Sequence, residues 1–408
     1  MRIVKDLNIS WELGETTEIK EIVKAVKKHG DKALREYTAR FDGVSLKEFK
    51  IDISENIIDQ ETQDAIKSSA EMVRKFSEKQ LAQLKDFEYK PIPGVFLGQR
   101  VIPIRRVGIY VPGGFPLVST LIMCGVPAKV AGVKEIIVCS PPSFNGTIHP
   151  TILAAARYLN INEIYAVGGP QAIAAMAYGT KTINKVDKIV GPGSIYVNLA
   201  KKEVFGDVGI DFIAGPTEVL IIADEAADPQ IIASDLLAQA EHDKNALPIL
   251  VTTCEKIAKE VNKTIDTQMQ ELSTKNTAKA SIEGGAILLV DDIDDAITAA
   301  NRIAPEHLEL QVKDPENYVD RLTNYGTLFI GELSAVALGD YSSGLNHTLP
   351  TNTGARYTGG LSVKDFLKLQ TTLRVTEKGF SEIAPVAKKL AEIEGLDGHI
   401  KSIEQRRS

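Results

Sequence analysis

The sequence predicts an α/β protein with two Rossmann-like parallel-sheet units, a helical N-terminal segment and a helical C-terminal tail. Short apolar runs of strand length alternate with helical segments, and glycine turns separate them. This pattern occurs twice, first over residues 101–190 and again over residues 218–331. The length of 408 residues suits two or three domains, each with its own core.

The composition is that of an ordinary globular chain, with 44% hydrophobic and 25% charged residues. It excludes a disordered chain, a collagen-like repeat and a coiled-coil rod. The 47 basic and 54 acidic residues give a net charge of −7, and no basic block occurs. We therefore expect no nucleic-acid partner and no polybasic membrane-surface module.

The chain has no apolar run near the ~20 residues that span a bilayer, and its N-terminus has no signal-peptide pattern. Three cysteines without paired spacing are not a disulfide framework; they are Cys124, Cys139 and Cys254. These features predict a soluble protein of the reducing cytoplasm, with no membrane association.

The first hundred residues are charged and helical in rhythm. Glu18–His29 places Ile19, Ile22, Val23 and Val26 on one face, and Gly30 follows as a stop signal. A second amphipathic helix is predicted over Ile66–Leu84.

The first α/β unit follows residue 100. Its predicted strands are Val101–Val111, Glu135–Cys139, Glu163–Val167 and Lys188–Val190, and its predicted helices are Pro150–Leu159 and Gln171–Tyr178. In the second unit, Asp228 is the expected N-cap and Pro229 the first residue of a helix that runs to His242. The other predicted elements of this unit are the strands Glu218–Ala223, Leu247–Val251, Ala286–Val290 and Thr327–Gly331, and the helix Asp294–Ile303; residues 382–408 form a charged helical tail.

Three glycine turns follow strands of the first unit: Val111–Gly114, Gly168–Gln171 and Gly191–Ser194. Such turns at the carboxyl ends of parallel strands are where ligands bind. None matches the G-x-G-x-x-G fingerprint or a P-loop. A single turn is explained by the need to turn the chain between strand and helix. Three such turns in one unit predict a crevice that binds a ligand, and they do not identify the ligand.

Four polar segments of the second half carry candidate chemistry. Gln239 and His242 share a helix face. Glu306 and His307 form a candidate acid–base pair, at a helix start or loop because Pro305 precedes them. The polar loop Gly339–Thr351 contains Asp340 and His347, and Glu394–His399 interrupts the tail. Taken singly, the helix-end, Glu306–His307 and tail segments are better explained as solvated polar residues.

The distribution of histidine favours a shared site, because four of the six histidines lie in these segments: His242, His307, His347 and His399. His242, His399 and Asp340, with Gln239 as a further candidate ligand, could supply a catalytic metal site. The ligands would be nitrogen and oxygen atoms, which suits zinc or manganese and leaves the choice open.

These segments, in this order, resemble the histidinol dehydrogenase family, and the resemblance runs over nearly the whole chain. The matching segments are Gly108–Gly114, Val126–Val133, Gly168–Thr180, Lys188–Val197, Gly215–Asp224, Asp235–His242, Ala304–Leu308, Gly339–Thr351 and Glu394–His399. The resemblance implies oxidation of an amino alcohol to an acid, the last step of histidine biosynthesis. Two NAD-dependent steps pass through a bound aldehyde.

The resemblance also implies roles for individual residues. Zinc would be held by Gln239, His242, Asp340 and His399, and would orient the substrate. His307 would be the general base of the first oxidation, and Glu306 would activate the water that adds to the aldehyde. Substrate contacts would come from these metal ligands and His307, and from Thr217, His347 and Glu394.

Tyr110, Gln171 and Ser194 match NAD-contacting positions. Two of the matches depart from the common pattern, because Ser194 stands where Asn is common and Thr217 where Ser is common. The resemblance implies a homodimer in which the C-terminal tail reaches the partner's site.

The resulting domain prediction is an N-terminal segment (1–20), a zinc and substrate domain (21–109 with 215–360), an NAD-binding domain (110–214) and the tail (361–408). Alternatives remain at this point. A relative in the family could oxidise another polar alcohol, such as a sulfonated diol. A zinc hydrolase would use Glu306 and a metal-bound water without NAD, and a binding protein would have no activity.

Overall fold

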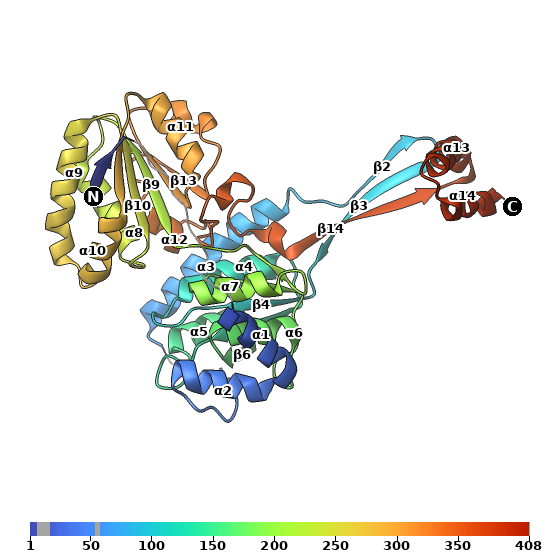
Figure 1. Cartoon of the computed structure of the whole chain (residues 1–408), viewed down its shortest axis with the longest axis horizontal. Coiled ribbons are helices and arrows are strands. Elements are labelled where there is room, and N and C mark those ends of the chain that lie inside the picture. Colours follow the sequence, from blue (N-terminus) through green and yellow to red (C-terminus); the bar gives the residue numbers. More distant parts are fainter. Residues whose placement is uncertain (6–16, 54–57, 408) are drawn as a thin grey trace.

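The computed structural model describes residues 1–5, 17–53 and 58–407 of the chain. It has two parallel sheets covered by helices, and a slender arm that carries the C-terminus away from both (Figure 1). The two parallel sheets confirm the predicted α/β class. No helix of the described ranges has the length and apolar character needed to cross a membrane.

The six-stranded sheet has the order β1-β11-β10-β9-β12-β13, and all its strands are parallel. Residues of its central strand alternate between two cores. Val219 and Ile221 pack toward helices α8, α9 and α10, whereas Leu220 and Ile222 pack toward α11. The elements are β1 (Arg2–Val4), β9 (Glu218–Ala223), β10 (Leu247–Thr252), β11 (Ala286–Leu289), β12 (His307–Gln311), β13 (Thr327–Ile330), α8 (Pro229–Ala240), α9 (Glu255–Gln268), α10 (Lys275–Gly284) and α11 (Ile293–Ile303).

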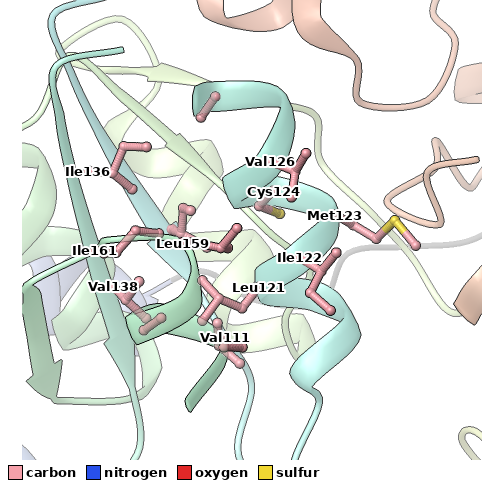
Figure 2. Close-up of a cluster of buried hydrophobic side chains, with 14 of the residues drawn as sticks. Val111, Leu121, Ile122, Met123, Cys124, Val126, Ile136, Val138, Leu159 and Ile161 are labelled. Atoms are coloured by element: carbon pink, nitrogen blue, oxygen red, sulfur yellow. The ribbon is translucent and has the colours of Figure 1, made fainter. Parts of the chain in front are cut away.

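The five-stranded sheet has the order β6-β5-β4-β7-β8 and is also parallel. Figure 2 shows one of its cores, where Leu121 and Val126 of α4 pack with Val138 of β5 and with Leu159 and Ile161. The elements of this unit are β4 (Arg106–Tyr110), β5 (Glu135–Ser140), β6 (Glu163–Ala166), β7 (Lys188–Val190), β8 (Gly209–Ile210), α4 (Val118–Val130), α5 (Pro150–Tyr158), α6 (Gly169–Tyr178) and α7 (Ile195–Val204).

The N-terminal helices are placed differently from the domain prediction, which grouped residues 21–109 with residues 215–360. Helices α1 (Thr17–His29) and α2 (Asp31–Asp42) pack on one face of the five-stranded sheet, and α3 (Gln60–Leu81) packs on the other. Residues 1–20 are not a separate segment either, since β1 pairs with β11 and α1 begins at Thr17. The apolar face of a helix fits either sheet, so its sequence does not identify its partner.

The arm was not predicted. It is an antiparallel sheet of β2 (Phe87–Ile92), β3 (Val95–Pro103) and β14 (Leu367–Val375), followed by α13 (Glu377–Ile393) and α14 (Asp397–Glu404) (Figure 1). The single strand expected over Val101–Val111 is therefore two strands in two sheets, with a break after Pro103. The helical part of the tail is as predicted.

Residues 211–217 lead directly from the carboxyl end of β8 to the amino end of β9. The carboxyl edge of the five-stranded sheet is thereby joined to the amino edge of the six-stranded sheet. Tyr110, Ser194, Thr217, Glu306 and His307 lie along these two edges, and Asp340 lies in the short helix α12 (Val336–Tyr341). The remaining helices are 3-10 turns: η1 (Met269–Glu271), η2 (Pro315–Arg321), η3 (Gly354–Arg356), η4 (Val363–Phe366) and η5 (Gln405–Arg407).

Candidate active site

Glu306 lies in the short loop after α11, which is one of the two predicted alternatives, whereas His307 is the first residue of strand β12, which was not predicted. Helix α11 ends at Ile303, its C-cap Ala304 has a left-handed φ of 53°, and the chain then turns into the sheet. The carbonyl of Glu306 accepts a 3.0 Å hydrogen bond from the amide of Thr327 in the next strand. Pro305 therefore precedes a strand here, and both Glu306 and His307 are buried.

The Glu306 carboxylate has two donors at the amino end of β9. The Thr217 hydroxyl donates to Oε2, and the amide of Glu218 donates to the same oxygen at 2.9 Å. Burial nevertheless raises the pKa of Glu306 to about 8, and the nearby charge of Asp340 acts in the same direction. Glu306 can therefore gain or lose a proton near neutral pH, as general acid–base chemistry requires.

Glu218 is a second buried carboxyl at this site, and sequence reasoning treated it only as the start of a strand. Its Oε1 accepts from the amide of Asn352 at 3.0 Å, and its Oε2 accepts from the amide of Glu306 at 3.3 Å. Burial raises its pKa to about 7. The sequence feature that could have identified Glu218 is a glutamate as the first residue of an otherwise apolar strand, which the structure shows to be buried.

The imidazole of His307 is held in one orientation by the backbone. Its Nδ1 lies 3.0 Å from the carbonyl oxygen of Glu218, and because a carbonyl only accepts, Nδ1 carries the hydrogen. Nε2 is buried without a hydrogen-bond partner among the described residues, and it lies 3.9 Å from Oδ1 of Asp340. Burial lowers the pKa of His307. The site thus presents a neutral imidazole whose Nε2 can accept a proton.

Gln239, in the last turn of α8, is linked to Glu306 through Thr217. Its Nε2 donates to the Thr217 hydroxyl, which in turn donates to Glu306. The amide oxygen of Gln239 is not used in this chain of hydrogen bonds. Helix α8 begins as predicted, since Oδ1 of Asp228 accepts from the amide of Gln230 at 2.7 Å.

Asp340 and two histidines lie near the same point. His347 directs Nδ1 toward the carbonyl of Asp340 at 3.2 Å. Burial lowers the pKa of His347, Asp340 opposes that shift, and His307 and His242 add to it, so all four groups are within electrostatic reach of one another. His242 itself is exposed, just beyond α8.

Glu394 and His399 are not brought to these residues within one chain. They flank the turn between α13 and α14, where Gly395 has a φ of 72°. Both are exposed, at the far end of the arm (Figure 1). Accordingly, no group of three or more His, Cys, Asp or Glu side chains able to hold a metal occurs within residues 1–5, 17–53 and 58–407 of a single chain.

The three predicted NAD-contacting residues lie at the carboxyl edge of the five-stranded sheet. The hydroxyl of Tyr110, at the end of β4, accepts a 3.0 Å hydrogen bond from the amide of Gly169. Gln171 is fully buried in α6, and neither of its amide atoms has a hydrogen-bond partner in the described part of the chain. Ser194 is exposed at the N-cap of α7.

A buried ion pair fixes the turn that precedes Ser194. Lys201 donates to the carbonyl of Gly191 and to Oδ1 of Asp211 at 2.7 Å, while Oδ2 of Asp211 accepts from the amide of Gly191 at 2.8 Å. Gly191 has a φ of 113°, and an added Cβ would collide with the carbonyl oxygen of Tyr110. Sequence reasoning missed Lys201 and Asp211 because a lone lysine in a helix usually reaches solvent.

The comparisons with known proteins agree on one family. The family model described as histidinol dehydrogenase matches residues 12–407. The histidinol dehydrogenase of Methanocaldococcus jannaschii is 45% identical over 396 residues, covering 95% of this chain and 91% of that protein. The histidinol dehydrogenase of Thermotoga maritima is 41% identical, covering all of this chain and 96% of that protein.

A solved structure is similar over the same length. The crystal structure of histidinol dehydrogenase from Elizabethkingia anophelis has a TM-score of 0.92 with this chain at 39% sequence identity. The match covers 98% of this chain and 94% of that one. The structural match therefore covers both sheets and the arm.

Proposed function

Because the chain belongs to the histidinol dehydrogenase family, we propose that it oxidises L-histidinol to L-histidine with two molecules of NAD, through bound histidinaldehyde. The observation that carries this proposal is the pair at the start of β12. A neutral His307 with an unpartnered Nε2 stands beside Glu306, whose pKa of about 8 permits both protonation states. His307 suits the oxidation of the alcohol as a general base, and Glu306 suits the aldehyde step as the group that activates water.

In the first step, His307 is the general base. Its Nε2 accepts the proton of the alcohol hydroxyl while the carbon releases hydride to NAD, which leaves the aldehyde and NADH. Because Nδ1–H is held by the Glu218 carbonyl, the base keeps one tautomer and one orientation. The lowered pKa of His307 keeps the imidazole unprotonated before the reaction.

In the second step, Glu306 activates water. The carboxylate accepts a proton from water, whose oxygen adds to the aldehyde carbon, while His307 returns the proton gained in the first step to the aldehyde oxygen, which gives the hydrated aldehyde. The hydrate then loses hydride to the second NAD and a hydroxyl proton to His307, which is now neutral, and this yields the acid. The two donors on Oε2, Thr217 and Glu218, stabilise the ionised carboxylate and leave Oε1 for the water.

Zinc fits the residues present at this point. The amide nitrogen of Gln239 is engaged by Thr217, which leaves its oxygen for a cation, and Asp340 and His242 add carboxylate and imidazole donors. We propose these three residues, with His399, as the zinc ligands. Zinc would supply a positive centre that holds and orients the imidazole and amino groups of the substrate. His347 and Glu394 would contact the substrate beside it.

His399 would come from the partner of a homodimer, since the arm keeps it away from the other three ligands of its own chain. The arm exposes large apolar side chains; among them Tyr89 is 59%, Leu373 64% and Ile393 70% exposed. Exposed apolar patches of this kind mark interfaces between protein chains. We propose that the partner covers this surface, and that each arm brings Glu394 and His399 to the partner's site.

NAD would bind over the carboxyl edge of the five-stranded sheet. Tyr110, Gln171 and Ser194 surround the glycine turns there, and the unpartnered amide of Gln171 offers a donor and an acceptor to the nicotinamide carboxamide or a ribose. We keep residues 110–214 as the NAD-binding part and residues 361–408 as the part that reaches the partner. The three free cysteines suit a cytoplasmic protein, which we also propose.

The test is a count of NADH formed per L-histidinol by zinc-loaded protein with excess NAD. Two NADH per histidinol, with histidine as the product, is the expected result. One NADH per histidinol would contradict the role of Glu306. No turnover, although zinc and NAD both bind, would contradict the substrate and favour another polar alcohol.

A further inference from the structure

A buried carboxyl cluster lies on the same face of β12 as His307 and has no part in the mechanism above. Glu309 and Gln311 follow His307 at alternate positions, so all three side chains point to one side of the sheet. Glu309 is 1% and Gln311 6% exposed. They meet the half-buried Asp235 of α8.

The side-chain amide of Gln311 bridges the two carboxyls of this cluster. Nε2 of Gln311 donates to Oε2 of Glu309 at 2.7 Å and to Oδ2 of Asp235 at 3.1 Å, which uses both of its hydrogens. Glu309 and Asp235 also contact each other directly. Two ionised carboxylates would repel at this distance, and burial raises the pKa of Glu309 well above its ordinary value. Burial and the nearby charge of Asp235 therefore both favour the neutral form of Glu309 by raising its pKa.

The cluster joins three elements that carry the proposed chemistry. Strand β12 supplies His307, and α8 supplies Gln239 one turn after Asp235. The third is α12, because the Glu309 carboxyl accepts a hydrogen bond from the amide of Val336, the first residue of that helix. Helix α12 carries Asp340 and has only six residues, so its own hydrogen bonds hold it weakly.

We propose that Glu309 is a positioning residue which, with Asp235 and Gln311, holds α12 against α8 and so fixes Asp340 relative to Gln239. This inference rests on the proposed function in one respect, namely that Asp340 and Gln239 bind zinc. Residues that orient metal ligands from behind set metal affinity, often by about 10–100-fold. The fixed element here is a whole helix, and the Gln311 amide that bridges Glu309 and Asp235 joins β12 to α8 behind it.

Two measurements test the proposal. The first is the zinc dissociation constant, obtained by competition with a coloured chelator. The second is hydrogen exchange of the α12 amides in metal-free protein, which needs neither zinc nor turnover. Glu309→Leu removes the carboxyl that accepts from Gln311 and from the amide of Val336, whereas Glu309→Gln keeps an acceptor in the same place. Leu310→Ala is the matched control, because Leu310 is buried on the opposite face of the same strand.

We expect Glu309→Leu to raise the zinc dissociation constant about tenfold or more and to speed exchange at α12. Glu309→Gln should resemble the parent protein in both measurements. Leu310→Ala should lower the melting temperature without changing the zinc dissociation constant or the hydrogen exchange of α12. If Glu309→Leu does not fold, Asp235→Ala at its half-buried position is expected to show the same two changes.

The proposal is overturned if the leucine variant behaves like Leu310→Ala, with lower stability but unchanged zinc affinity and unchanged α12 exchange. It is also overturned if the glutamine variant is as impaired as the leucine variant. If the parent protein binds no zinc, the metal part of the proposed function fails, and the α12 exchange alone decides whether the cluster holds the helix.

Discussion

Nδ1 of His307 lies 3.0 Å from the backbone carbonyl oxygen of Glu218, and this contact decides which nitrogen of the imidazole can act as a base. The next residue back, Glu306, takes a hydrogen bond from the amide of the same Glu218. One residue of β9 thus positions both the base and the carboxyl. Every substitution of Glu218 except proline keeps this backbone carbonyl and amide, so both groups can stay in place when the side chain changes.

Glu306→Gln should separate the two half-reactions. The amide cannot accept a proton from water, so oxidation of supplied histidinaldehyde should fall about 10²–10⁴-fold. Oxidation of histidinol to the aldehyde should fall much less. Single-turnover measurements of NADH formation from each substrate provide the test, and His307→Ala is the contrasting variant, because the proposed mechanism uses His307 in both oxidations and both should fall. An equal loss in both steps for Glu306→Gln would contradict the assigned role.

The metal-free protein should lose stability through Glu306 as the pH rises. The folded pKa of Glu306 is about 8, against an ordinary value of 4.5, so between these values the folded chain holds a proton that the unfolded chain has lost. The free energy of unfolding therefore falls as pH rises through this range. Glu306→Gln has no such titration, and its melting temperature relative to the parent should rise between about pH 5 and about pH 8.5. A difference that stays constant with pH would show that Glu306 titrates normally.

Two inactive variants should restore activity when combined. His242→Ala removes a ligand from the chain that forms most of the site, and His399→Ala removes the ligand that the arm would bring to the partner. In a random mixture of dimers, half are heterodimers with one intact site, so about a quarter of the parent activity should return. Mixing requires denaturation and refolding together. Separately refolded samples that are then pooled serve as the control, and a mixture no more active than this pool would place His399 in its own chain's site.

Gly191→Ala should weaken NAD binding. The new Cβ would collide with the carbonyl oxygen of Tyr110, at a φ of 113° that a side chain already strains, so we expect a stability loss of about 1–3 kcal/mol or more. The matched control is Gly206→Ala, because Gly206 has a φ of 103° but open space around it. Equilibrium NAD binding and thermal melting of both variants test this. Equal NAD affinities in the two variants would mean that the turn does not shape the cofactor site.

The sequence predicted the two parallel sheets well because their strands are buried on both faces. Strands such as β9 and β10 read as unbroken apolar runs, and glycine or proline marks their ends. Strand β12 escaped prediction because His307, Glu309 and Gln311 alternate with leucines. Three polar residues in one buried strand suggest a surface segment, and only their partners on α8 and α12 explain their burial.

The arm escaped prediction for a different reason. Strands β3 and β14 pair over their whole length, from Val95 opposite Val375 to Pro103 opposite Leu367, yet they are far apart in the sequence. No local pattern indicates that two such distant segments are neighbours. The site residues His399 and Glu394 were identified by family resemblance alone, since the segment around them is a polar helix end.

The pairing of β3 with β14 also has a consequence for biosynthesis of the chain. The hairpin of β2 and β3 is translated early, but its partner strand β14 follows every strand of both parallel sheets in the chain. The nascent chain therefore displays Tyr89 and Leu97 on an incomplete sheet while both parallel sheets can already assemble. Translation of β14, and not completion of the cores, sets the earliest moment at which two chains can associate through complete arms.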